Sequence, residues 1–402
     1  MMRHLLKLVW NRKRTNALII LEIFFSFLVV FVVATLGLYF WDNYRQPLGY
    51  TWQNVWKVSV DMKSEGGRND DDATKAARLK VVERMVREIE ALEPIESAAV
   101  AMISPYDQGG WTSGERIDGK QIEMEANAAT DRFADVMGMK VVSGRWFQET
   151  DSEVAYDPIV IDQDLARELY GDDDAVGKEL GEPQPGEKPR RIVGVVSEFR
   201  KSGELSARTN FMFQRLRLDV PFWFEPRSIL VKVKPGTPAA FEEELATLLQ
   251  GIAPEWSFQV RPLPQERTSV FREMLAPLVA GGIIAFFLLL MVALGLFGVL
   301  WQNLLQRTRE LGLRRAAGAS RSSVHRQVIS EQAILTSFGV LLGVILVIQI
   351  PVLDLVGFIR PEVFAGGLLF AMAAIYLLST LCAFYPSSMA SRVQPAEALR
   401  YE

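Results

Sequence analysis

Few side chains in this 402-residue chain have the types and spacing that catalysis or metal binding requires. The two histidines are His4 and His325, and Cys382 is the one cysteine. An intramolecular disulfide and a cysteine-based zinc site are therefore excluded. The long polar segment from Asp42 to Glu273 contains no histidine, which excludes a Ser–His–Asp triad there.

The segment from Gly171 to Lys178 (GDDDAVGK) has the outline of a phosphate-binding loop but not its chemistry. Five residues separate its glycines where four are required, and Glu179 stands in the place of Ser or Thr. Three consecutive aspartates would repel a phosphate, and Asp172 to Asp174 lack the alternating spacing of a calcium-binding loop. We interpret the segment as a solvated turn, and we expect no catalytic site, metal or cofactor in this chain.

A different kind of chemistry is indicated from Gln306 to Gln327, where the sequence is QRTRELGLRRAAGASRSSVHRQ. Its basic side chains suit binding to a partner, although an ordinary basic loop beside a membrane has the same composition. We expect Gly312 and Gly318 to break the segment, and Ser320 to cap the helix that follows. The predicted contact consists of Arg307, Arg309, Glu310, Gly312, Leu313, Arg314, Arg315, Gly318, Ala319, Ser320 and Arg321.

The elements that would position this segment are membrane-spanning helices. Four apolar runs are long enough to cross a bilayer, which needs about 20 residues. The first, which follows five basic residues, reads as an uncleaved signal anchor. The runs are Ala17 to Trp41, Leu278 to Trp301, Ala333 to Val352 and Val363 to Tyr385.

Charge is distributed very unevenly along the chain. The segment from Asp42 to Glu273 has 30 basic and 41 acidic residues, whereas the remainder has 14 basic and 7 acidic. A basic remainder with long apolar runs indicates a membrane protein and excludes a simple cytosolic enzyme. The acidic soluble part argues against binding to nucleic acid.

Positive charge in the short connections predicts the orientation. The N-terminus and the loop between the second and third runs are rich in Lys and Arg, whereas the loop between the third and fourth has only Arg360. We therefore expect both termini in the cytoplasm; the resemblance described below implies a bacterial cell. The segment from Asp42 to Glu273 is then extracytoplasmic, and the chain is a multi-pass protein of the cytoplasmic (inner) membrane.

Two features within the apolar runs have alternative interpretations. Glu22 in the first run either makes a buried polar contact or extends to the cytoplasmic interface. Gly339 and Gly343 form a GxxxG motif that permits close helix packing. The motif is equally compatible with packing inside one chain and with packing across a dimer.

The extracytoplasmic segment contains one strand–helix–strand pattern twice. Val55 to Val60, a helix ending before Pro94, and Ile95 to Ile103 form the first unit. Ser228 to Val233, a helix from Phe241 to Ile252, and Trp256 to Val260 form the second. We predict a split internal duplication whose two units sit side by side.

Between these units we expect a strand-rich insert, at about residues 104–224, in which Arg191 to Val196 is a strand. The fold class is thus an α-helical membrane protein with four transmembrane helices and a large α+β extracytoplasmic domain. That domain consists of a split βαβ subdomain and the insert. The expected divisions are residues 1–41, 42–273 and 274–402.

The segment RTRELGLRRAAGASRSSVHRQVISEQAIL resembles the signature of FtsX-type permeases, and the tail VQPAEALRYE is similar to that family's ending. Glu331 matches the acid at the start of the following span. In the external part, ATDRFADVMGMKVVSGRWFQETD, DPIVIDQDLARELYGDDDAVGKEL and RRIVGVVSEFR resemble the MacB-type periplasmic core domain.

The resemblance implies the non-catalytic permease subunit of an ABC transporter, acting in export, efflux or a lipoprotein or cell-envelope function. Such proteins transmit ATP-driven motion of cytoplasmic subunits to the external domain. The expected partners are a separate ABC ATPase chain, a second permease chain, membrane lipid and in some relatives a membrane-fusion protein. The second permease is either an identical or a paralogous chain. The sequence has no usable Walker A motif, and only a short basic segment precedes the first run.

Two other classes of function are alternatives to a transporter subunit. A membrane-anchored sensor with an external ligand-binding domain would have the same topology. A membrane-embedded enzyme has no supporting constellation of residues. Copurification of an ATPase would separate the transporter from both alternatives.

Overall fold

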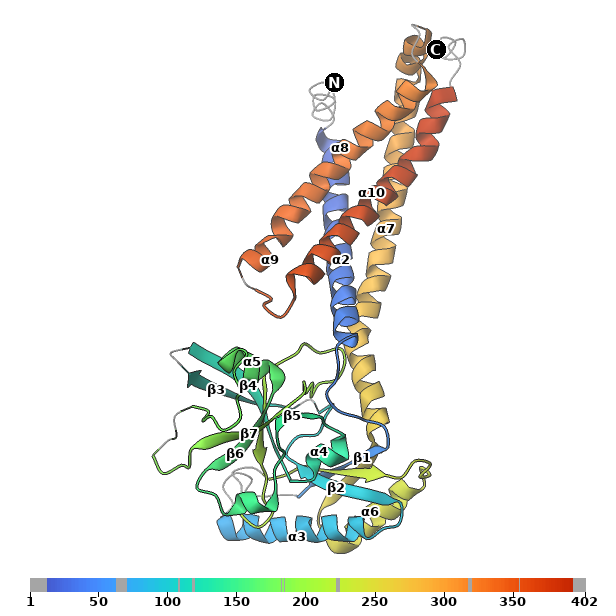
Figure 1. The fold of residues 1–402 in the computed structure, drawn as a ribbon. Helices are drawn as coiled ribbons and strands as arrows, with labels where there is room; N and C mark the ends of the chain where they lie inside the picture. Colours follow the sequence, from blue (N-terminus) through green and yellow to red (C-terminus); the bar gives the residue numbers. More distant parts are fainter. Residues whose placement is uncertain are drawn as a thin grey trace. The chain divides into compact units, whose positions relative to one another are not determined.

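A computed structural model describes residues 13–62, 71–107, 109–117, 120–181, 183, 185–221, 225–316, 320–353 and 355–392. The chain divides into two compact units, which are shown together in Figure 1. The sheet unit comprises Asn43–Glu273, and the helical unit comprises Met1–Asp42 with Met274–Glu402.

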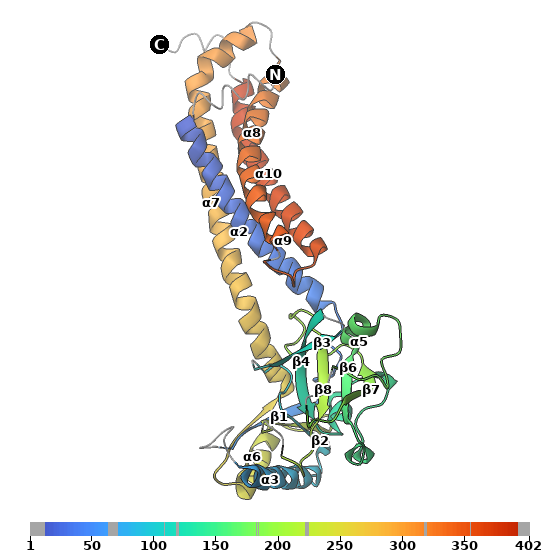
Figure 2. The ribbon, with the colours of Figure 1, turned by 90° about the vertical axis from the view of Figure 1, so that its left-hand side faces the viewer.

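The helical unit contains four long helices that run alongside one another (Figures 1 and 2). Each includes an apolar stretch long enough to cross a membrane, at Ala17–Tyr44, Leu263–Gln302, His325–Val352 and Pro361–Ser388. The four predicted spans are therefore confirmed. The helices are α2 (Lys13–Tyr44), α7 (Leu263–Ala316), α8 (Arg321–Val347) and α10 (Pro361–Arg392), and α9 (Gln349–Val352) is a short turn of helix after α8.

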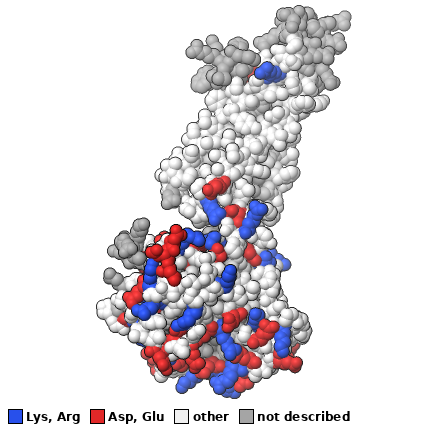
Figure 3. All heavy atoms as spheres, in the orientation of Figure 1, with Lys and Arg blue, Asp and Glu red and all other residues white. Residues whose placement is uncertain are grey.

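The surface of the helical unit differs from that of the sheet unit. On the face drawn in Figure 3, charged side chains gather over the sheet unit, while most of the helical unit is uncharged. Large apolar side chains such as Phe286, Leu294 and Leu369 are more than 60% exposed. Such exposure is expected where the surrounding medium is lipid.

The sheet unit is built on ten strands in the order β10-β1-β9-β2-β4-β8-β6-β7-β5, with β3 paired to β4. Its first four strands and two helices are the predicted strand–helix–strand units. Helices α3 and α6 cover one face of these strands (Figure 2). The elements are β1 (Val55–Asp61), α3 (Asp72–Glu90), β2 (Ile95–Ala101), β9 (Ser228–Val233), α6 (Phe241–Ile252) and β10 (Ser257–Pro262).

The split βαβ subdomain is confirmed, but the prediction that its two units sit side by side is wrong. Strand β9 lies between β1 and β2, and β1 lies between β10 and β9. Each crossover helix leaves a gap between its two parallel strands, and an antiparallel strand of the other unit fills that gap. The resulting order is that of a ferredoxin-like sheet.

The core of this subdomain follows from the period of each element. Alternate β1 residues Trp56, Val58 and Val60 are buried together with Met85 and Ile89 of α3. The period-2 strand and the period-3.6 helix thus present their apolar faces to each other. Asp71 begins α3 by accepting a hydrogen bond from the backbone N of Thr74 at 3.0 Å.

The predicted insert is rich in strands, as expected, and extends the same sheet beyond β2. Its parallel pairs are β4 with β8 and β6 with β7. A cluster of buried aromatic rings, including Phe133, Phe199 and Phe213, packs against these strands. The elements are β3 (Trp111–Ile117), β4 (Lys120–Ala129), α4 (Phe133–Met137), β5 (Val141–Gly144), η2 (Glu149–Ser152), β6 (Asp157–Asp162), α5 (Gln163–Tyr170), β7 (Arg190–Val196) and β8 (Phe211–Arg215).

Candidate functional site

The predicted partner contact lies at the connection between α7 and α8. Helix α7 continues to Ala316, so the prediction that Gly312 breaks the segment is wrong. One glycine costs a helix only about 1 kcal/mol, and its neighbours here are Leu, Arg and Glu, which favour helix. The α7 residues of the contact are Arg307, Arg309, Glu310, Gly312, Leu313, Arg314 and Arg315.

The remaining contact residues lie around the start of α8. Gly318 and Ala319 are outside the described residues. Ser320 is the N-cap of α8, and its side chain accepts a hydrogen bond from the backbone N of Ser323 at 3.2 Å. Arg321 is the first residue of that helix. The basic segment is therefore the end of one long helix, a short connection and the beginning of the next helix.

The glycines of the GxxxG motif face α2 of the same chain. A Cβ atom added at Gly339 would lie 2.6 Å from Cγ2 of Ile23, and one added at Gly343 would lie 2.2 Å from Cδ1 of Phe27. Both distances are shorter than carbon atoms tolerate, so only glycine permits this approach. The motif therefore packs against α2 within this chain, while packing across a dimer stays a prediction.

Helix α2 makes similar close contacts with the other two long helices. A Cβ atom at Gly367 of α10 would lie 2.0 Å from Oγ1 of Thr35. At Gly295 of α7 it would lie 2.8 Å from Oε2 of Glu22. The Glu22 carboxylate therefore lies beside α7, and its side chain is half-buried. Helix α2 is the element on which α7, α8 and α10 all pack.

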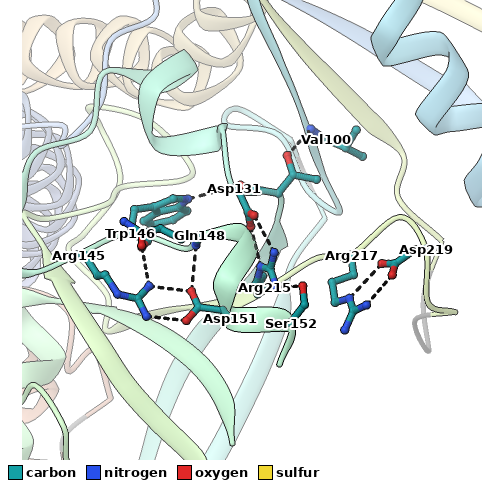
Figure 4. Close-up of polar contacts among 11 residues, drawn as sticks. Val100, Asp131, Arg145, Trp146, Gln148, Asp151, Ser152, Arg215, Arg217 and Asp219 are labelled. Carbon is teal, nitrogen blue, oxygen red and sulfur yellow. Dashed lines mark hydrogen bonds and ion pairs between the residues drawn. The ribbon is translucent and has the colours of Figure 1, made fainter. Parts of the chain in front are cut away.

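In the sheet unit, paired charges join the loops of the insert (Figure 4). Arg145 donates to both carboxylate oxygens of Asp151, at 2.7 and 2.5 Å. Arg215 of β8 binds both oxygens of Asp131 at 2.7 Å and donates to Oγ of Ser152 at 2.9 Å. Such bidentate pairs add geometric specificity to charge. They tie η2 and the turn after β4 to the strands.

Burial alone would raise the pKa of Asp151. Hydrogen bonds from Arg145 and from the backbone N of Gln148 outweigh that effect and hold the pKa below its usual range. Asp151 therefore stays ionised at neutral pH. Arg145 and Asp151 both lie in the segment ATDRFADVMGMKVVSGRWFQETD, but the sequence alone did not predict that they form an ion pair.

A second buried carboxylate behaves in the opposite way. Asp162 is 1% exposed at the end of β6, where its Oδ1 accepts from the backbone N of Leu165 at 2.9 Å and begins α5. Burial raises the pKa of Asp162 to about 7, against the lowering effect of that hydrogen bond and of Arg208. The sequence alone did not single out this residue.

Two cavities open in the sheet unit, but neither gathers a ligand set of one kind. One, of about 660 Å³, is lined by Lys57, Trp111 and Gln259, among others. The other, of about 770 Å³, has both acidic and basic walls, such as Asp157 and Arg190. Nowhere in the described part of the chain do three or more His, Cys, Asp or Glu converge as metal ligands. The GDDDAVGK segment is exposed at Asp172 to Asp174.

Two segments of the chain match known domain families. Residues 17–248 match the MacB-like periplasmic core domain, and residues 282–395 match the FtsX-like permease C-terminal domain. The chain belongs to the MacB/FtsX-type permeases.

Two relatives of this MacB/FtsX-type permease are named as a permease and as a macrolide export protein. The ABC transporter permease YknZ of Bacillus subtilis is 24% identical over 292 residues, which cover 70% of this chain and 71% of that protein. The macrolide export ATP-binding/permease protein MacB 2 of Aeromonas hydrophila is 28% identical over 284 residues. That alignment covers 67% of this chain but only 42% of the Aeromonas protein.

Solved structures of external domains are also similar to this permease. The periplasmic region of MacB from Actinobacillus actinomycetemcomitans aligns with 55% of this chain and 94% of its own, at 16% identity and a TM-score of 0.37. The extracellular domain of YknZ aligns with 51% of this chain and 100% of its own, at 15% identity and a TM-score of 0.35.

Proposed function

We propose that this permease couples ATP hydrolysis on a separate ABC ATPase chain to a conformational change of its sheet unit. The observation that carries the proposal is the continuity of α7. This single helix of 54 residues begins at Leu263, within the sheet unit, and ends with the basic contact residues up to Arg315. Pro277 removes one backbone hydrogen bond inside this helix. The helix nevertheless continues through it, so displacement at one end is transmitted along the helix to the other.

The chemistry of the contact supports an ATPase as the partner. Arg314, Arg315 and Glu310 are suited to charge-assisted hydrogen bonds across a protein interface. The sequence contains no usable Walker A motif, so ATP binding falls to the partner. Because ATP sites of ABC ATPases form between two subunits, two such contacts are needed. We therefore propose two permease chains in each complex, either identical or paralogous.

Purification of the tagged chain from its native membranes tests this proposal. We expect an ABC ATPase to copurify, and the mass of the complex to require two permease chains. Glu310→Lys and Gly318→Val should weaken that association or uncouple hydrolysis from transport. Glu255→Lys, an exposed charge reversal in the sheet unit, is the control. Wild-type association and transport in both contact variants would remove the assignment, and absence of any ATPase would favour a sensor.

The proposed orientation places the sheet unit outside the cytoplasmic membrane, with both termini inside. It is supported by the basic residues of the α7–α8 connection. In a Cys382→Ser background, a cysteine replacing exposed Asp172 should react with a membrane-impermeant thiol reagent in spheroplasts. A cysteine replacing exposed Ser322 should not react. Labelling of Ser322→Cys in intact spheroplasts would contradict this orientation.

A further inference from the structure

The loop between β7 and β8 contains charged side chains that are almost completely buried. Arg200, Lys201 and Glu204 are 2%, 6% and 8% exposed. Buried charges are rare in proteins unless they are paired. Three of them in five residues therefore call for a structural explanation, which their partners supply.

Arg200 donates hydrogen bonds to the end of α2 and to the residues just after it. Its Nη1 donates to the backbone oxygens of Asn43 at 2.8 Å and Gln46 at 3.3 Å. Its Nη2 donates to the backbone oxygens of Glu204, at 2.6 Å, and Ser206. The last carbonyls of a helix have no partner within the helix, and a guanidinium satisfies them well.

Residues in and after α2 also donate hydrogen bonds to the loop. The Asn43 side chain donates from Nδ2 to the backbone oxygen of Leu205 at 3.2 Å. Tyr50, a few residues after α2, donates its hydroxyl to the backbone oxygen of Arg200 at 3.3 Å. The loop and the end of α2 are therefore cross-linked by backbone and side-chain hydrogen bonds rather than by one contact.

Glu204 forms an ion pair with Arg267 near the beginning of α7. Its Oε1 accepts from Nε of Arg267 at 2.6 Å, and its Oε2 accepts from the hydroxyl of Tyr106 at 3.3 Å. The Arg267 guanidinium also lies over the rings of Trp52, at 4.6 Å, and Phe271, at 4.5 Å. This packing restricts Arg267 and adds a cation–π contribution.

The backbone of the loop is adapted to this position. Gly203 has φ +90°, and a Cβ atom there would lie 2.6 Å from Cε1 of Tyr106. A side chain at this residue would therefore be both strained and in collision. Lys201 donates from Nζ to the backbone oxygen of Gly109 at 2.8 Å and pairs with Glu125 of β4 at 3.4 Å, which joins the loop to the insert.

We propose that the segment Arg200–Ser206, the coupling loop, makes the insert follow the movements of α2 and α7. Chain continuity already joins α2 to β1 and α7 to β10, so the ferredoxin-like strands follow those helices directly. No element of the insert continues into either helix. The insert is joined to the ferredoxin-like strands by the β2–β4 pair, and to the segment after α2 by the hydrogen bond from Thr51 to the backbone oxygen of Met137. The coupling loop supplies a further connection, because it joins β7 to β8 and binds both helix ends. Arg200 and Glu204 are its positioning residues.

The energetics favour joint movement over sliding. Separating Arg200 or Glu204 from its partners would leave a buried charge without hydrogen-bond partners, which is strongly unfavourable. A displacement of the helix ends therefore carries the loop along. This inference rests on the proposed function, in which such displacements are driven by ATP.

Distance measurements between spin labels test the inference in the complex with its copurified ATPase, in a Cys382→Ser background. One pair joins Glu362, at the start of α10, to Asp172 in the insert. The other joins Glu362 to Glu255, just before β10. All three sites are exposed, and dilution with unlabelled chains removes signals between copies. In the wild type, trapping the ATP-bound state should change both distances.

Glu204→Gln removes the charge that holds Arg267 while keeping the shape of the side chain. We expect ATPase association, hydrolysis and the Glu362–Glu255 change to persist, and the Glu362–Asp172 change to be lost. The double variant Glu204→Gln/Arg267→Gln, which leaves no unpaired charge, should behave alike. Glu115→Gln is the matched control, since its 2.8 Å pair with Arg190 has similar burial but does not contact either helix.

Each outcome has a distinct meaning. If the ATP-dependent change in the Glu362–Asp172 distance persists in both Glu204 variants, the proposal that this loop couples the insert to the helices is wrong. Loss of the fold in both variants would also overturn it, since the pair would then serve stability alone. Absence of any ATP-dependent change in the wild type would instead contradict the proposed function, and the inference would fall with it.

Discussion

The helical unit and the sheet unit both have glycines at their closest contacts, and the sheet unit adds buried charge. In the helical unit the closest contacts between helices are at glycines, such as Gly343 against Phe27 and Gly367 against Thr35. The sheet unit has equally close glycines, such as Gly203 against Tyr106, and adds guanidinium groups, such as Arg200 on backbone carbonyls. In lipid, apolar side chains gain nothing from leaving the solvent, so close van der Waals contact favours small residues. In water, hydrogen bonds to buried charge also order the loops.

This difference implies different sensitivities to substitution. Adding atoms at a close glycine contact should be harmful in both units. Removing or adding charge should matter most in the sheet unit, and only where the charge is buried. Three substitutions test this comparison.

The largest effect is expected for Gly343→Val. The new Cβ atom would lie 2.2 Å from the Phe27 ring, so α2 and α8 must separate. Overpacking typically costs 1–3 kcal/mol, and a contact this short should cost about 3 kcal/mol. Thermal unfolding of the purified protein in detergent measures the loss. Gly298→Val is the control, because no atom lies within 4 Å of its added Cβ. Equal stability of the two variants would break the comparison.

An intermediate effect of opposite sign is expected for Asp162→Asn. The folded pKa of Asp162, at about 7, lies above its ordinary value of 3.8. The folded state therefore binds the proton more tightly than the unfolded state does. The stability that this provides is complete below about pH 4 and is lost as the pH rises through about 7. Asn begins a helix as well as Asp does.

The variant should accordingly match the wild type at pH 4 and be more stable at pH 8. Each unit of pKa difference corresponds to about 1.4 kcal/mol, and hydration and relaxation around the ionised carboxylate should hold the gain to about 2 kcal/mol. Chemical denaturation of both proteins at the two pH values measures it. A variant that loses stability at pH 8 would show that the ionised carboxylate is better accommodated than its burial indicates.

The smallest effect is expected for Asp219→Asn. Its side chain is 63% exposed, and its bidentate pair with Arg217 lies at the surface. The hydrogen bond from Arg217 lowers the pKa of Asp219, so any contribution is present above pH 4 and lost on acidification. Exposed pairs contribute about 0.2–1 kcal/mol. Denaturation at neutral pH should show a change at the low end of that range. A loss as large as that of Gly343→Val would end the distinction between buried and exposed charge.

Several features could be predicted from local sequence because local physics governs them. The apolar runs identified all four spans, since about 20 apolar residues suffice to cross a bilayer. Alternation identified β1, and helical spacing identified α3. Ser320 was recognised as a cap because its side chain acts only three residues away. The failure at Gly312 is equally local, since its helix-forming neighbours outweighed one glycine.

Features that depend on residues distant in sequence were decided only by the tertiary structure. The interleaving of β9 between β1 and β2 depends on which gap each strand fills, and no single segment specifies that. The partner of Gly343 became known only when α2 was packed beside it. Arg200 reads in sequence as one more surface charge, yet it is buried on the carbonyl of Asn43, 157 positions earlier. Its role arises because folding removes the water that would otherwise have solvated both groups.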